Sequence, residues 1–86
     1  MNTGRVWHVR QKVICVDGAF SSDELNVCDA VPISGVSYTI REIRHTADDI
    51  AFLFEEITNP PIVFGREPGF WQSRFDSCER SRANAI

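Results

Sequence analysis

The amino-acid sequence predicts an all-β protein, a small antiparallel β-barrel of about five strands. A chain of 86 residues forms one domain with a small core. Residues 38–43 (YTIREI) and 52–57 (FLFEEI) share one pattern, an alternation that slips by one position before the final isoleucine. Alternation buries one face of a strand, and a slip indicates a bulge. The two hexamers therefore predict a strongly bent hairpin, with residues 44–51 as its loop.

The first expected strand covers residues 5–16. Its odd positions carry apolar residues, which are Trp7, Val9, Val13 and Cys15. The alternation breaks at Gln11, so the segment forms either one strand or two short strands joined by a bend. The apolar run 13–16 indicates a strand that is buried on both faces or lies at a barrel seam. Asp17 and Gly18 then mark the end of this element.

Residues 17–35 form one long connection in the predicted fold. Ser22 is followed by Asp23 and Glu24 and is expected to cap a single helical turn, since acidic residues are favoured at helix N-termini. A loop of this length in a compact domain usually carries function or is only partly ordered. Two interpretations stay open, a recognition loop and a surface excursion without a partner.

Residues 36–43 form the second expected strand, and the segment that follows is ambiguous. Thr46 resembles a helix cap, and apolar residues follow it at helical spacing, namely Ile50, Leu53, Phe54 and Ile57. As a strand, the same segment buries alternate apolar residues. The abundance of Phe and Ile favours a strand. The shared pattern of residues 52–57 and residues 38–43 favours a strand, so we expect a strand over residues 50–57.

Prolines and glycines divide the remainder of the chain. Asn59 and the two prolines after it end the preceding strand. Residues 62–64 (IVF) form a brief edge strand, and residues 70–75, with three aromatic side chains, form the last strand. Residues 5–76 are thus the single predicted barrel domain. The polar segment 77–86 lacks periodicity and is predicted to be a frayed, flexible tail.

Composition argues against a membrane-spanning or metal-binding protein. The apolar runs are too short to cross a bilayer, and no apolar region follows Arg5, so we expect a cytoplasmic protein. Cys15, Cys28 and Cys78 form an odd, widely spaced set, which predicts reduced thiols and not a disulfide framework. Structural zinc sites use closely spaced pairs of ligands, and no such pair occurs here. The sequence therefore predicts no metal and no cofactor.

Four segments of the chain resemble a group of small uncharacterised proteins of bacteria and their phages or prophages. The order and spacing of these segments match the group, at residues 12–17, 35–43, 54–61 and 69–75. The resemblance implies a small SH3-like β-barrel and supports a strand over 50–57, but it implies no activity. Asp76 and Ser77 stand where the group continues with Arg-Pro, so any contact made by that arginine is missing here.

The residue pattern gives no support for catalysis. Glu55 and Glu56 are consecutive, so a strand directs them to opposite faces and they form no close carboxylate pair. The chain also lacks a glycine-rich phosphate loop and a G-x-S-x-G nucleophile motif. We therefore expect a protein that is not an enzyme.

Small barrels of this kind bind either peptides or nucleic acid, and fold alone does not decide between them. Peptide grooves are lined by aromatic side chains, and the candidates are Trp7, Tyr38, Phe64, Phe70, Trp71 and Phe75. Most of these fill the core of so short a chain. We expect Phe70 and Phe75 to point inward and Trp71 to lie at the surface. The edge 62–64, which includes Phe64, invites pairing with a partner or with a second copy of the chain.

Nucleic-acid binding is the alternative. The basic residues near the two termini are Arg5, Arg10, Lys12, Arg66, Arg74, Arg80 and Arg82. Arg66 and Arg74 flank Trp71, a combination that suits base stacking and phosphate contact. The overall charge argues against nucleic-acid binding. The chain has a net charge of −3 and a pI of about 5.2, whereas nucleic-acid-binding domains are usually strongly basic. The sequence thus predicts an interaction module for a protein partner or for itself, with Trp71, Arg66, Arg74 and Phe64 as its binding residues.

Overall fold

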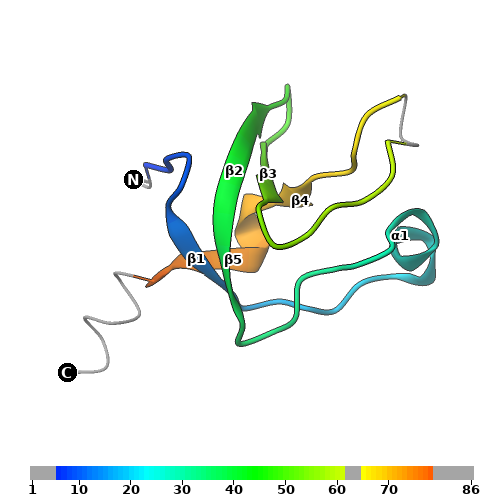
Figure 1. Cartoon of the computed structure of the whole chain (residues 1–86), viewed down its shortest axis with the longest axis horizontal. Helices are drawn as coiled ribbons and strands as arrows, with labels where there is room; N and C mark the ends of the chain where they lie inside the picture. The colour runs from blue at the N-terminus through cyan, green and yellow to red at the C-terminus, as the bar shows by residue number, and fades with distance from the viewer. Residues whose placement is uncertain (1–5, 62–64, 79–86) are drawn as a thin grey trace.

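The structure is a computed structural model that describes residues 6–61 and 65–78. In this part of the chain five strands, one α-helix and one 3-10 helix follow one another (Figure 1). They are β1 (Lys12–Cys15), α1 (Ser22–Val27), β2 (Ser37–His45), β3 (Ile50–Phe54), β4 (Phe70–Trp71), η1 (Gln72–Arg74) and β5 (Phe75–Ser77). The all-β prediction is confirmed. Neither helix within these residues has the length and hydrophobicity that crossing a membrane requires.

The strands form one antiparallel sheet in the order β4-β3-β2-β1-β5. The long strand β2 pairs with β1 through its first residues and with β3 through its later ones. Between these two parts the pairing register shifts, because Ile40 faces Phe54 whereas Glu42 faces Leu53. A bulge of this kind bends a strand. The predicted slip in residues 38–43 is therefore confirmed, and so is the hairpin, although its loop is shorter than expected and covers only residues 46–49.

Strands β4 and β5 lie at opposite edges of the sheet although only the three residues of η1 separate them. Four residue steps span at most about 14 Å of fully extended chain. Five strands laid flat are about 19 Å from first to last. The sheet must therefore curl so that its two edges approach each other, although the described strand pairs do not close it into a barrel.

The prediction of one strand over residues 70–75 is wrong. Phe70 and Phe75 are both buried, yet they are an odd number of positions apart, so one continuous strand would direct them to opposite faces. The 3-10 turn of η1 resets the alternation and carries the chain from one sheet edge to the other. Both rings consequently reach the same core. There the ring centroid of Phe75 lies 4.9 Å from the ring centroid of Phe54.

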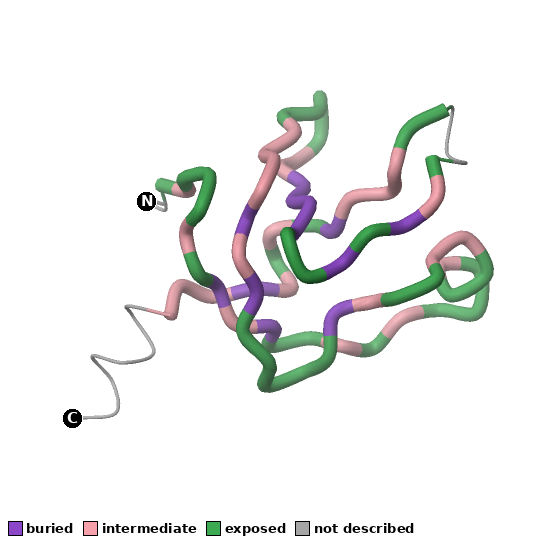
Figure 2. Tube along the Cα trace, in the orientation of Figure 1, coloured by how far each residue is buried: buried purple, intermediate pink, exposed green. Residues whose placement is uncertain are grey.

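The core is aromatic and centres on β3, one of several stretches that Figure 2 colours as buried. Phe52 and Phe54 are completely buried and pack against the other core rings. Leu53 is buried as well, so the strict alternation expected here is wrong. The backbone at Gly69 covers the second face of β3. It lies close to Ala51 and Leu53 because glycine has no side chain to keep it away. The choice of a strand over a helix for this segment is confirmed as far as Phe54.

Three predicted boundaries are wrong at the ends of elements. The first strand covers only Lys12–Cys15, because a turn precedes it in which Arg10 adopts a left-handed backbone with φ 75°. The helix cap is Ser21, one residue earlier than expected, and Ser21 and Glu24 bond to each other's backbone N–H in a capping box. Ser77, which was assigned to the tail, pairs with β1 as part of β5. The predicted edge strand 62–64 lies outside the described residues.

Candidate groove beside Trp71

A groove of about 390 Å³ lies between the β2–β3 hairpin and the segment that leads from Arg66 into β4. Figure 1 shows the path of the backbone in these two parts of the chain. Its lining comes from both sides and consists of Arg44, Thr46, Ala51, Arg66, Glu67, Pro68, Gly69 and Trp71. The groove brings together Arg66 and Trp71, two of the residues that the sequence analysis selected. These two residues are therefore the starting point for the candidate site.

Trp71 is exposed because β4 is an edge strand whose two residues face opposite ways. Phe70 points into the core, and Trp71 retains 43% of its surface. Directly opposite Trp71 on β3 is Ala51, which is buried. Residues that face each other across an antiparallel pair project from the same side of the sheet. The indole ring therefore lies over a small residue and leaves its other surface exposed, so the prediction that Trp71 lies at the surface is confirmed.

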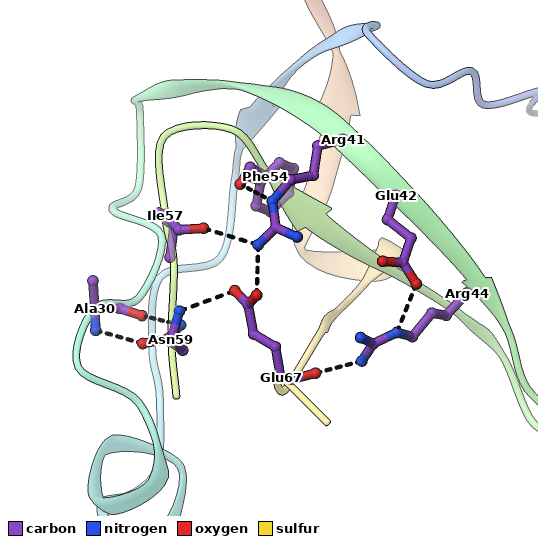
Figure 3. Close-up of polar contacts among 8 residues, drawn as sticks. All are labelled: Ala30, Arg41, Glu42, Arg44, Phe54, Ile57, Asn59 and Glu67. Carbon is purple, nitrogen blue, oxygen red and sulfur yellow. Dashed lines mark hydrogen bonds and ion pairs between the residues drawn. The ribbon is translucent and has the colours of Figure 1, made fainter. Parts of the chain in front are cut away.

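The wall of the groove is held in place by Glu67 (Figure 3). One carboxylate oxygen lies 2.6 Å from Nη2 of Arg41, and the other accepts a hydrogen bond of 3.0 Å from the backbone N–H of Asn59. The backbone carbonyl of Glu67 accepts a hydrogen bond from Arg44. These contacts fix a segment that contains no α-helix and only an isolated bridge before β4.

The arginines of this region differ in how many ion pairs and hydrogen bonds their guanidinium groups form within the protein. Arg41 also donates to the Phe54 carbonyl over 2.9 Å, and Arg44 forms an ion pair of 3.1 Å with Glu42. Arg66 is exposed and forms no ion pair with any residue in the described ranges. The groove therefore presents one uncommitted guanidinium group beside its exposed aromatic ring.

Arg74 is not part of the groove. Its guanidinium donates to the backbone carbonyls of Asp17 and Ala19 over 3.1 and 2.7 Å. It forms ion pairs with Asp17 and Glu24, and its carbon Cζ lies 3.9 Å from the ring centroid of Phe20. Only 14% of the Arg74 side chain remains exposed. The structure thus uses this arginine to fasten the start of the long connection 17–35 onto the end of η1.

The far end of the same connection is fastened by Asn59. This side chain is buried, and its amide both accepts from the backbone N–H of Ala30 and donates to the Ala30 carbonyl, each over 2.9 Å (Figure 3). In the sequence Asn59 marks only the end of a strand, and neither Arg41 nor Glu67 is a candidate site residue. A buried asparagine or an ion pair between distant residues leaves no local pattern that could have revealed these roles.

The remaining predicted candidates are not gathered at the groove. Phe64 lies outside the described residues. Tyr38, Phe70 and Phe75 are buried, as most aromatic candidates were expected to be. Trp7 is partly buried, and its indole N–H donates to Gln72 over 2.7 Å.

The described residues hold no cluster of three or more His, Cys, Asp or Glu side chains with the geometry of a metal site. Burial raises the pKa of the thiols of Cys15 and Cys28 above the ordinary value.

Comparisons of the chain with models of protein families, with curated proteins and with solved structures find no match.

Proposed function

We propose that this protein is a non-enzymatic interaction module that binds an extended segment of a protein partner in the groove beside Trp71. The observation that carries the proposal is the exposed indole of Trp71 at the edge of a groove of about 390 Å³. Tryptophan and arginine are enriched among the residues that dominate binding energy in protein interfaces. In this groove Trp71 and Arg66 line one surface.

The finer description of the fold, an SH3-like barrel, belongs to the same proposal. Two observations support it, the curl that η1 imposes on the sheet and the resemblance of four sequence segments to small phage and bacterial proteins. We also propose a phage or prophage origin, on the resemblance alone. A cytoplasmic location is consistent with the three free cysteines, Cys15, Cys28 and Cys78.

An extended peptide suits this groove because of how the site is built. The hairpin forms one side and the segment before β4 the other, and the lining includes small residues such as Ala51 and Gly69. Aromatic-lined grooves of this kind bind peptides that are already extended, at a low cost in conformational entropy. Self-association, in which a second copy supplies the segment, is one form of the same function.

Nucleic-acid binding is the second candidate, and the pairing of Trp71 with Arg66 favours it, since aromatic and basic side chains together bind single strands. Two features weigh against it. Arg74, the other basic residue of the predicted site, forms hydrogen bonds and an ion pair with residues of the protein itself. The net charge of −3 repels a phosphate backbone.

A pull-down with tagged protein, run with and without nuclease, tests this function. We expect a protein partner to be retained after nuclease treatment and to be lost when Trp71 is replaced by alanine. The matched control is Ile33→Ala, which removes an apolar side chain that is 62% exposed and does not line the groove. Retention by Trp71→Ala would show that the groove is not the binding site, and prey lost on nuclease treatment would favour nucleic acid.

A further inference from the structure

Building on the proposed function, we infer that the groove selects a partner segment in which a carboxylate side chain stands next to an apolar one. Arg66 binds the carboxylate of an aspartate or glutamate, and Trp71 contacts the neighbouring apolar side chain. The groove is thus specific for short acidic-apolar segments and not for extended peptides in general.

The hydrogen-bond donors and acceptors along the groove favour an acidic ligand. Glu67 is the one acid among its lining residues. Both oxygens of its carboxylate are already occupied, by Arg41 and by the backbone N–H of Asn59. This acid therefore has little capacity left for a cationic ligand. Arg66 keeps its full set of guanidinium donors, since none of its side-chain nitrogen atoms bonds to a residue in the described ranges.

The pairing of charges at the groove leaves Arg66 uncompensated. Glu67 pairs with Arg41 and Glu42 pairs with Arg44, whereas Arg66 has no ion pair within the described residues. A carboxylate that reaches Arg66 therefore gains a charge-assisted contact, and guanidinium binds carboxylate in a bidentate geometry.

Charge also separates an acidic peptide from a nucleic acid. Thr46, at the hairpin side of the groove, accepts hydrogen bonds from the backbone N–H groups of Asp48 and Asp49, so two acidic residues follow it in the hairpin loop. These acids and the net charge of −3 disfavour a ligand that carries a negative charge on every unit. A peptide places its charge at one position, against Arg66, and can be neutral elsewhere.

The apolar half of the ligand is set by the surroundings of Trp71. Pro68, Gly69 and Ala51 line the groove beside the indole and offer few polar groups. An aliphatic or proline side chain fits such a surface, because aromatic rings bind prolines and aliphatic groups without needing a hydrogen-bond partner. The two side chains of the ligand must be close in sequence, since Arg66 and Trp71 line the same groove.

Selection from a displayed library of random peptides tests the inference, with wild-type protein, Arg66→Glu and Trp71→Ala as targets. We expect wild type to enrich Asp or Glu beside Leu, Ile, Val or Pro. Synthetic versions of the enriched peptides should lose about tenfold to a hundredfold in affinity for Arg66→Glu, the loss of one charge-assisted hydrogen-bonded pair. Arg66→Lys keeps the charge but not the bidentate geometry, so as the matched control it should lose less affinity than Arg66→Glu.

The outcomes separate this inference from the function on which it rests. Enriched peptides without an acidic preference, lost on Trp71→Ala but unaffected by Arg66→Glu, would overturn the inference and leave the peptide-binding function standing. Failure to enrich any peptide, together with enrichment from a random single-stranded DNA pool run in parallel, would overturn both. Circular dichroism of each variant establishes that the fold is retained.

Discussion

Replacement of Arg74 by alanine should destabilise the protein, because this side chain joins the long connection to the end of η1. The variant loses hydrogen bonds to the carbonyls of Asp17 and Ala19, each contributing about 1 kcal/mol. It also loses the contact over the Phe20 ring, about 0.5–1 kcal/mol. The ion pairs with Asp17 and Glu24 add only about 0–1 kcal/mol, since both carboxylates are largely exposed.

Together these contacts predict a loss of about 3 kcal/mol in the free energy of unfolding, and a melting temperature lowered by more than about 10 °C for a domain of this size. Urea denaturation followed by tryptophan fluorescence measures the first quantity, and calorimetry measures the second. The matched control is Arg66→Ala, an exposed arginine without an ion pair in the described part of the chain, which should change stability by no more than about 0.5 kcal/mol.

The reasoning is refuted if Arg74→Ala unfolds at the same urea concentration as the wild type. A variant of unchanged stability that nevertheless fails to bind a partner would show that Arg74 contacts the ligand, as the sequence analysis suggested. A loss of stability with the groove still able to bind would establish the structural role. Arg74→Lys should recover only a small part of the loss, because one ammonium group cannot reach both carbonyls and both carboxylates.

Two further predictions concern titratable groups. Burial works to raise the pKa of Glu56, but hydrogen bonds from the backbone N–H and hydroxyl of Thr39 outweigh it and lower the pKa. Stability from this group is present above its unfolded pKa and is lost as the pH falls through the folded one, so Glu56→Gln should be less sensitive than wild type to acidification below about pH 4. Equal acid sensitivity of the urea midpoints would contradict this. Burial raises the pKa of Cys15, so a thiolate-specific reagent at about pH 8 should modify Cys78 in the folded protein and Cys15 only after unfolding. Peptide mapping that finds both modified equally fast would be evidence against the burial of Cys15.

The sequence by itself predicted the features that depend on near neighbours along the chain. The repeated hexamer predicted the hairpin of β2 and β3, because side-chain alternation with period two is a local property of a strand. The one-residue slip located the bulge of β2 for the same reason. Of the candidate site, the exposure of Trp71 was predicted, since its neighbours Phe70 and Phe75 had to point inward.

Only the tertiary structure decided which residues meet across long separations in the chain. Arg74 bonds to a carbonyl 57 positions away, and Arg41 pairs with Glu67 across 26 positions. The sequence made Arg74 a candidate for ligand binding, because a basic residue beside aromatic ones looks the same whether its partner is a ligand or a distant loop. The groove itself arises in the same way, since its two walls come from separate segments that the curled sheet brings together. Local periodicity specifies which face of a strand is buried, but the identity of the group that covers that face depends on the path of the whole chain.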